Sequence, residues 1–423
     1  MSPLCHTRLV RAASADVLAF SNRAAAQALA RGDALRALGS VGRAEDALGL
    51  TLRGIAYAQL GDLTLARSSL DRASKLTKAP LARARIQAAL TEIAMSDGDP
   101  ARAARAARAC ADELARLGDA RNAAMQRLVV ARAEVLLGRL AEARHVVSEL
   151  LASSPALPPD VVAVAWLAKA EIAVRAIAAT EAREALKRAR AAMDGAPNEL
   201  LARALVALEA ELSKPVARLE RDCVVRNADL YAIEAASTGA LLLVDACRRI
   251  VIAGRASVPL ARRPVLFALL LVLARALPRD VARDELAARA FGVARVNASH
   301  RSRLRVEIGR LRQVLAGLAE PVATEDGYRL ASSREVITLL PPSEDDDARI
   351  AILMSDGAAW SAQALAEHAG VSKRTVQRAL AALVEAGGTI RSGHGKDVRY
   401  TRAGAPMASR MLLLGLVPTT RPE

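Results

Sequence analysis

The chain has 423 residues and a formal net charge of +15, with 52% hydrophobic but only 2% aromatic residues. This length accommodates about two to four domains, and the positive charge favours an anionic partner, either nucleic acid or a membrane surface. The longest apolar runs, such as PVLFALLLVLARAL (264–277), are too short to span a bilayer as a helix.

The start of the chain, MSPLCHTRLVRAASADV, contains no apolar core of signal-peptide length. The four cysteines are far apart and form no CxxC pair, so we expect reduced, structural thiols. They are Cys5, Cys110, Cys223 and Cys247. Together these features predict a soluble, cytoplasmic protein.

Residues from about 12 to 213 are predicted to be almost wholly helical. Four similar phrases each place a glycine five residues before an alanine: RGDALRAL (31–38), LGDLTLARSSL (60–70), DGDPARAARAA (97–107) and LGRLAEARHVV (137–147). The glycine is typical of a helix end, and the alanine lets the following helix approach closely. Asp62 and Asp99 fall in these turns and are predicted to cap helices rather than to act as acid or base.

The best copy of the repeat, GIAYAQLGDLTLARSSLDRA (54–73), resembles a tetratricopeptide repeat. The resemblance implies an α-solenoid domain over residues 1–215. Such a solenoid presents a concave face that binds a peptide, a partner domain or a small ligand. An irregular helical bundle without a superhelix is the alternative.

A second domain is predicted over residues 236–340, where the periodicity changes. ALLLVDACRRIVIAGRASVPL (240–260) has short β-branched and aliphatic runs, which indicate three short strands. Helical segments follow, and then two strands joined by a turn. These are RRPVLFALLLVLARAL (262–277), RDELAARAFG (283–292), SRLRVEIGRLRQVL (302–315) and PVATEDGYRLA (321–331). Strands, three helices and a terminal hairpin predict a winged helix.

The third of these helices has the pattern of a helix that enters the major groove of DNA. Its apolar stripe, at helical spacing, is predicted to face the core and consists of Leu304, Ile308, Leu311 and Leu315. Arginines flank the stripe on both sides, at Arg303, Arg305, Arg310 and Arg312. Small outward residues allow a close approach to base edges, and flanking guanidinium groups reach the phosphates.

Residues 238–331 resemble the OmpR/PhoB-type winged-helix domain of bacterial response regulators, on the segments LFALLLVLA, RDELAARAFG, VEIGRLRQVL and GYRL. The resemblance implies DNA contacts from Ser302, Arg303, Val306, Glu307, Arg310 and Arg312. The wing departs from the family pattern, because Glu325 and Asp326 would repel phosphate. The helical N-terminal half lacks the βα alternation of a receiver domain, so phosphorelay control is not expected.

A third domain is predicted over residues 348–404, behind the acidic linker PPSEDDDARI (341–350). In QALAEHAGVSKRTVQRALAAL (363–383), Gly370 suits the turn of a helix-turn-helix and Ser372 suits an N-cap. The buried stripe of the second helix is Val376, Leu380 and Leu383. Its N-terminal end, which meets bases in such motifs, carries Lys373, Arg374, Thr375, Gln377 and Arg378.

A glycine-bearing hairpin follows at TIRSGHGKDVRYT (389–401) and adds further candidate DNA contacts, at Arg391, His394, Lys396 and Arg399. The segment resembles the winged helix-turn-helix of many bacterial repressors. The tail 405–423 is a candidate dimerisation element.

The sequence contains no constellation that supports catalysis. The five histidines are scattered without HExxH spacing, and no GxxxxGK[ST] phosphate loop is present. We therefore predict no enzymatic activity, no metal and no cofactor.

These patterns predict a mainly α protein, with an N-terminal tetratricopeptide-like α-solenoid followed by two winged-helix (α+β) domains. The predicted function is sequence-specific DNA-binding transcription regulation. Double-stranded DNA is the expected partner, together with a protein or peptide on the repeat domain, and a homodimer is left open. Two alternatives are a helical-repeat scaffold whose winged helices contact proteins, and a nonspecific nucleoid-type DNA binder.

Overall fold

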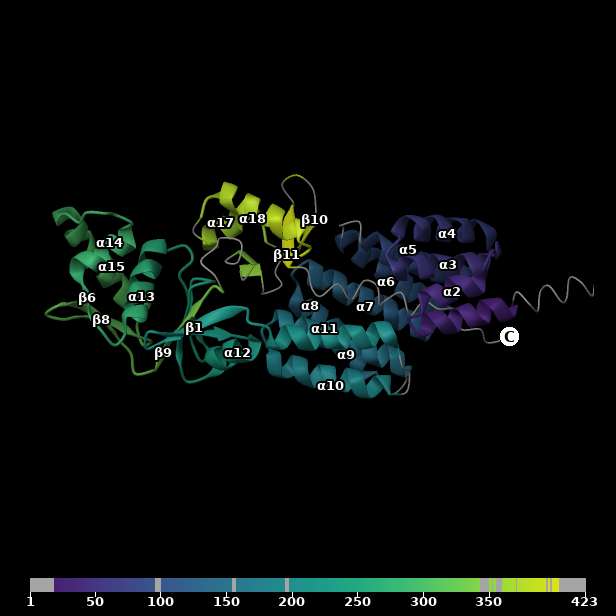
Figure 1. The fold of residues 1–423 in the computed structure, drawn as a ribbon, viewed down its shortest axis with the longest axis horizontal. Coiled ribbons are helices and arrows are strands. Elements are labelled where there is room, and N and C mark those ends of the chain that lie inside the picture. The colour runs from purple at the N-terminus through teal and green to yellow at the C-terminus, as the bar shows by residue number, and fades with distance from the viewer. Residues whose placement is uncertain are drawn as a thin grey trace, which may run out of the picture.

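A computed structural model of the protein describes residues 19–95, 100–153, 157–194, 198–342, 350–351, 353–354, 360–369, 371–392, 395 and 398–402. Helices account for most of these residues. Figure 1 shows an elongated molecule, with the N-terminal helices at one end and a mixed helix and strand region at the other. The predicted tail 405–423 and linker residues 343–349 lie outside the described residues.

The N-terminal half is a run of paired helices, as predicted. Its helices are 19–30, α2 (Ala34–Val41), α3 (Ala47–Leu60), α4 (Leu63–Leu76), α5 (Pro80–Met95), α6 (Pro100–Arg116), α7 (Ala120–Leu136), α8 (Leu140–Ala152), α9 (Pro159–Arg175), α10 (Ala179–Met193) and α11 (Glu199–Ser213). From α2 onward, each helix packs on the next. Contacts also join α3 to α5, α5 to α7 and α7 to α9, so alternate helices stack into a layer. We call this run the helical array.

The short turns of the array follow from glycine and aspartate. Gly61 and Gly138 adopt the left-handed conformation, with φ of 91° and 74°, which glycine enters without a Cβ penalty. Asp62 caps α4 by accepting the N–H of Leu65 at 2.9 Å, as predicted. The predicted alanines of close approach are all buried, at Ala37, Ala66, Ala103 and Ala143. Gly98 and Asp99 lie outside the described residues.

A six-stranded sheet follows the array. Its strands are β1 (Ala217–Arg221), β2 (Val224–Ala228), β3 (Leu242–Asp245), β4 (Ile250–Ala253), β5 (Ala256–Pro259) and β9 (Val336–Leu340), in the order β2-β1-β9-β3-β4-β5. β3 and β9 are parallel, and the other neighbours are antiparallel. The three strands predicted within 240–260 are confirmed as β3, β4 and β5.

The same sheet holds elements that the sequence patterns did not predict: β1, β2 and β9, with α12 (Leu230–Thr238) between β2 and β3. β1 pairs with β9 through Leu219 and Leu339. The sheet thus begins at Ala217, upstream of the predicted domain start at 236. The predicted boundary leaves out two strands of this sheet and falls within α12.

Three helices and a small sheet follow β5. They are α13 (Pro264–Ala276), β6 (Val281–Ala282), α14 (Arg283–Phe291), α15 (Ala298–Val314), β7 (Glu320–Ala323) and β8 (Gly327–Ala331), and the small sheet has the order β6-β8-β7. All three helices contribute side chains to one core, which also contains Val244 and Val251 of the large sheet. The order of three helices and a terminal hairpin is the predicted one.

The C-terminal unit is smaller. It comprises helical residues at 350, 351 and 353, α17 (Ala362–Ala369), α18 (Lys373–Glu385), β10 (Thr389–Ser392) and β11 (Arg399–Arg402). A bridge between Trp360 and Tyr400 extends the hairpin. Its core contains Ile350, Leu365 and Val376, each fully buried.

Among the described residues, contacts to both the helical array and the turn between β3 and β4 attach the C-terminal unit to the rest of the chain. Ile390 of β10 packs against the hydrophobic core formed by α5 to α11. The guanidinium of Arg249, in the turn between β3 and β4, donates to the carbonyl oxygen of Ala369 at the end of α17, at 3.0 Å. Figure 1 shows the C-terminal unit, in yellow, between the array and the mixed region.

Candidate nucleic-acid interface

The helix α18 is fixed by its cap and by its buried side. Ser372 is the N-cap, as predicted, and its hydroxyl accepts the N–H of Thr375 at 3.1 Å. Val376 and Leu380 are fully buried, and Leu383 packs against the same core at half exposure. The buried stripe therefore turns the opposite side of α18 towards solvent.

That solvent-facing side carries a cluster of positive and amide groups. The exposed side chains are Lys373, Arg374, Gln377 and Arg378, and none of the four has a hydrogen-bond or ion-pair partner among the described residues. Thr375 is half-buried, and its hydroxyl shares a 2.8 Å hydrogen bond with Ser372. The first turn of α18 contains no acidic residue, so the helix N-terminus adds to the positive potential.

The predicted contact residues of the hairpin that follows α18 differ in exposure. Arg391 on β10 is exposed. Arg399 on β11 is half-buried and donates from Nη1 to the carbonyl oxygen of Val398 at 3.0 Å. His394 and Lys396, both predicted DNA contacts, lie outside the described residues. So does Gly370, the predicted turn residue.

The predicted stripe of α15 is buried. Leu304, Ile308, Leu311 and Leu315 are each at most 2% exposed. The opposite side is open, and Val306 is 55% exposed. Ser302 and Arg305 are also exposed and lack a side-chain partner within the described part of the chain. An exposed valine on a polar helix face can contact a thymine methyl group.

The other predicted side chains of α15 are held by neighbours. The Arg303 guanidinium lies 4.6 Å from the centre of the Phe291 ring on α14. Glu307 is only 12% exposed and accepts a 2.9 Å hydrogen bond from Arg310. Arg312 donates from Nε to the carbonyl oxygen of Pro321 at 3.0 Å. These contacts orient the arginines and leave the Glu307 carboxylate little access to a ligand.

The turn between β7 and β8 is acidic at its surface, as the sequence predicts. Glu325 and Asp326 are exposed. Arg283, at the start of α14, donates to the carbonyl oxygens of Glu325 at 3.0 Å and of Thr324 at 2.8 Å. These bonds hold the turn against α14, and the two carboxylates oppose its approach to phosphate.

Sequence patterns missed the bracing of α15 by its neighbours. Asn297 and His300 form a capping box, in which each side chain accepts the other's backbone N–H, at 3.0 Å and 3.3 Å. Arg301 makes a bidentate pair with Asp284 on α14, at 2.8 Å and 2.6 Å. The spacing Asn-x-x-His is a recognisable cap signal, whereas the pair with Asp284 depends on tertiary packing.

The described residues offer no other obvious chemistry. They contain no cluster of three or more histidine, cysteine or acidic residues that could hold a metal ion. Among the described helices, none is both long and apolar enough to cross a membrane. Cys110, Cys223 and Cys247 are all free thiols, and Cys5 lies outside the described residues.

Comparison with known families gives a match at this same place. Residues 348–399 match the family described as HTH domain. The match covers α17, α18 and the start of the hairpin, and it implies DNA as a partner of the C-terminal unit. No curated protein and no solved structure matches the chain.

Proposed function

We propose that this protein is a sequence-specific DNA-binding transcription regulator. The observation that carries the proposal is the exposed N-terminal end of α18, with Lys373, Arg374, Gln377 and Arg378 inside the segment that matches an HTH domain. In helix-turn-helix proteins this end of the second helix meets base edges in the major groove. Exposed side chains that form no hydrogen bonds with the other described residues are available for that contact.

Roles within α18 follow from side-chain chemistry. Arginine pairs in bidentate fashion with guanine, and glutamine with adenine. Arg374, Gln377 and Arg378 are therefore assigned to bases, and Lys373 and Arg391 to phosphates, where a mobile ammonium or guanidinium positions the protein without reading sequence. Ser372 and Thr375 organise the helix start, and Arg399 supports the hairpin.

The middle region is proposed as a second DNA-reading unit, of the OmpR/PhoB type. Support comes from the order of its helices and hairpin and from the outward face of α15, where Ser302, Arg305 and Val306 are open. Arg303 and Arg310 approach phosphates from positions fixed by Phe291 and Glu307. Glu307 and Arg312 then act by orienting neighbours rather than by touching bases.

The helical array is proposed as a tetratricopeptide-like domain that senses a ligand or docks a partner, without enzymatic activity. Stacking of alternate helices α3, α5, α7 and α9 supports a superhelix rather than an irregular bundle. The domain limits remain predictions, at 1–215, 236–340 and 348–404. The strands β1 and β2, which precede residue 236, are added to the second domain. A cytoplasmic location and a homodimer belong to the same proposal.

The deciding experiment selects random duplex DNA with the purified full-length chain at about 150 mM salt, because lower salt exaggerates charge effects. We expect an enriched motif. The substitutions Arg374→Ala and Arg378→Ala should each weaken binding to it by roughly 10-fold or more, about 1–3 kcal/mol. Arg127→Ala, at an exposed site of α7, is the matched control and should leave binding unchanged.

The same selection separates the alternatives. Binding that disappears as salt rises, with no enriched sequence, would identify a nonspecific nucleoid-type binder. No DNA binding at all would leave the scaffold. Substituting Arg305 and Val306 on α15 shows whether the motif has a second half. If α15 also reads bases, the variant should lose sequence preference at positions of the motif other than those that α18 reads.

A further inference from the structure

The first and last helices of the array are in direct contact. Asn198, the N-cap of α11, donates from Nδ2 to the carbonyl oxygen of Ala30 at 2.7 Å, across 168 residues of sequence. The N–H of Glu199 donates to the carbonyl oxygen of Arg31 at 3.2 Å. A Cβ on Gly32 would lie 3.0 Å from Cγ of Leu200, so the two segments touch closely. We call this contact the seam.

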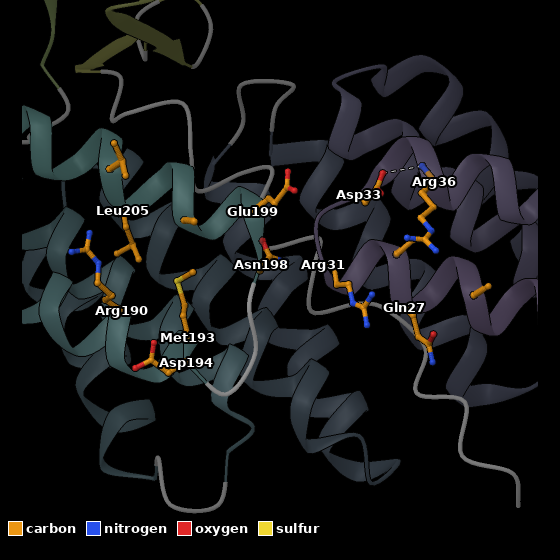
Figure 2. Close-up of a pocket in the computed structure, with 14 residues that line it drawn as sticks. Gln27, Arg31, Asp33, Arg36, Arg190, Met193, Asp194, Asn198, Glu199 and Leu205 are labelled. Carbon is orange, nitrogen blue, oxygen red and sulfur yellow. Dashed lines mark hydrogen bonds between the residues drawn. The ribbon is translucent and has the colours of Figure 1, made fainter.

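A pocket of about 900 Å³ opens at the seam (Figure 2). This volume lies within the range of sites for small organic ligands, about 300–1,000 Å³. One wall comes from the helix 19–30 and α2, and the other from the end of α10 and the start of α11. Ala28, Met193 and Leu205 make part of the lining apolar.

The two walls carry opposite charges that do not neutralise each other. Arg31 and Arg36 are exposed on the first wall, and neither guanidinium has a partner among the described residues. Asp194 is exposed on the second wall, and its carboxylate also has no partner in the described part of the chain. Figure 2 shows Arg31 and Asp194 on different sides of the pocket.

The remaining charged groups of the lining are already engaged. Arg190 makes two hydrogen bonds of 2.8 Å to Glu209. The Asp33 carboxylate accepts the backbone N–H of Arg36 at 3.0 Å as the N-cap of α2. Glu199 accepts a 3.2 Å bond from Arg203. The groups left for a ligand among the described lining residues are therefore two guanidiniums on the first wall and one carboxylate on the second.

We propose that the seam pocket binds a zwitterion of the amino-acid class, either a free amino acid or a dipeptide. Its carboxylate is received by Arg31 and Arg36, whose planar guanidiniums match a carboxylate in a bidentate manner. Its ammonium group faces Asp194, and its side chain packs on Met193 and Leu205. A ligand in this position bridges the first and last helices and holds the seam closed.

The test is isothermal titration of the full-length chain with the common L-amino acids and their glycyl dipeptides. We expect at least one to bind. Arg31→Gln, Arg36→Gln and Asp194→Asn should each weaken its binding by roughly 10-fold, the loss of one charge-assisted hydrogen bond. Arg43→Gln and Asp112→Asn make the same charge changes at exposed positions outside the lining and should have no effect.

Analogues of the bound compound that lack either the amine or the carboxylate test the zwitterion directly, and each should bind at least about 10-fold more weakly. The proposal is overturned if no compound of the panel binds, if an amine-free analogue binds equally well, or if the control substitutions weaken binding as much as the pocket ones. Circular dichroism verifies that every variant is folded. The outcome is independent of DNA binding, which is measured separately.

Discussion

At the scale of single residues, two buried glutamates of the array behave oppositely. Glu92 on α5 is 2% exposed, and burial raises its pKa well above the ordinary value, although a 3.0 Å hydrogen bond from Gln126 opposes the shift. Burial would also raise the pKa of Glu171 on α9, but the charges of Arg132 and Arg175 prevail and lower it. One neutral amide does not stabilise a buried carboxylate as two guanidiniums do.

The Glu92 carboxyl gives the first prediction, a pH dependence of stability. The folded chain keeps the Glu92 proton where the unfolded chain has released it, so this contribution to stability is complete below the ordinary pKa and is lost as pH rises towards the folded one. Glu92→Gln cannot titrate. Urea unfolding at pH 5 and pH 8 measures the free energy of unfolding of both proteins. That of the variant should rise relative to that of the wild type as pH rises, by about 1.4 kcal/mol for each unit by which the folded and unfolded pKa values of Glu92 differ.

Glu142→Gln is the control for this experiment, because Glu142 is exposed on α8 of the same array. It should leave the pH dependence of the wild type unchanged. A difference in unfolding free energy between the wild type and Glu92→Gln that is the same at both pH values would show that the pKa of Glu92 is not raised in the folded chain.

At the scale of elements, sequence patterns predicted the features that depend on residues close together in the chain. The spacing of Leu304, Ile308 and Leu311 predicted the buried side of α15, and Ser372 marked the start of α18. The strands β1 and β2 were missed because their turn uses Asp222 and Cys223 at positive φ instead of glycine or asparagine. β9 was missed because its partners β1 and β3 are distant in sequence, so no hydrophobic period within the segment indicates that it pairs with them.

Two glycines of the middle region give a prediction about elements. A Cβ on Gly327 would lie 1.9 Å from the carbonyl oxygen of Val281, inside the pairing of β6 with β8. Gly309 on α15 has open space around its Cβ position. Gly327→Ala should therefore destabilise the small sheet, whereas Gly309→Ala should stabilise α15 by about 0.5–1 kcal/mol through helix propensity.

Amide hydrogen exchange is the appropriate measurement, because it reports the two elements separately. Protection should fall at Tyr328 and Val281 in Gly327→Ala and rise along α15 in Gly309→Ala. Unchanged amide protection of β8 in Gly327→Ala would mean that β6 moves away from the added methyl group without a cost in stability. If α15 approaches DNA through Gly309, the second variant should bind DNA less well in spite of its greater stability.

At the scale of the whole molecule, sequence patterns gave the order of the units but not their contacts. The seam joins residues 168 positions apart, and nothing in the repeat phrases indicates that the first and last helices meet. The attachment of the C-terminal unit is equally nonlocal, since Ile390 packs on the array and Arg249 binds the end of α17. Such contacts depend on how the successive helices stack in three dimensions, which helix propensity and hydrophobic period do not specify.

This attachment gives the last prediction, made with the double variant Ile390→Ser, Arg249→Ala. Removing the apolar contact and the hydrogen bond to Ala369 should free the C-terminal unit, so small-angle scattering of the full chain should give a larger radius of gyration. Val384→Ser changes a 37% exposed side chain of the same unit and should leave the radius unchanged. With Trp166→Phe added to both the wild type and the double variant, so that Trp360 is the remaining tryptophan, retained near-ultraviolet dichroism would show that the unit itself stays folded.

The same variant tests the proposal that α18 and α15 both read bases of one duplex. If the attachment fixes α18 relative to α15, the wild type recovers half-sites at one spacing, and freeing the unit broadens the range of spacings. Affinity for the best site should also fall, because a looser connection lowers the effective concentration of the second contact. An unchanged radius together with an unchanged range of spacings would show that the contacts of Ile390 and Arg249 do not hold the unit in solution.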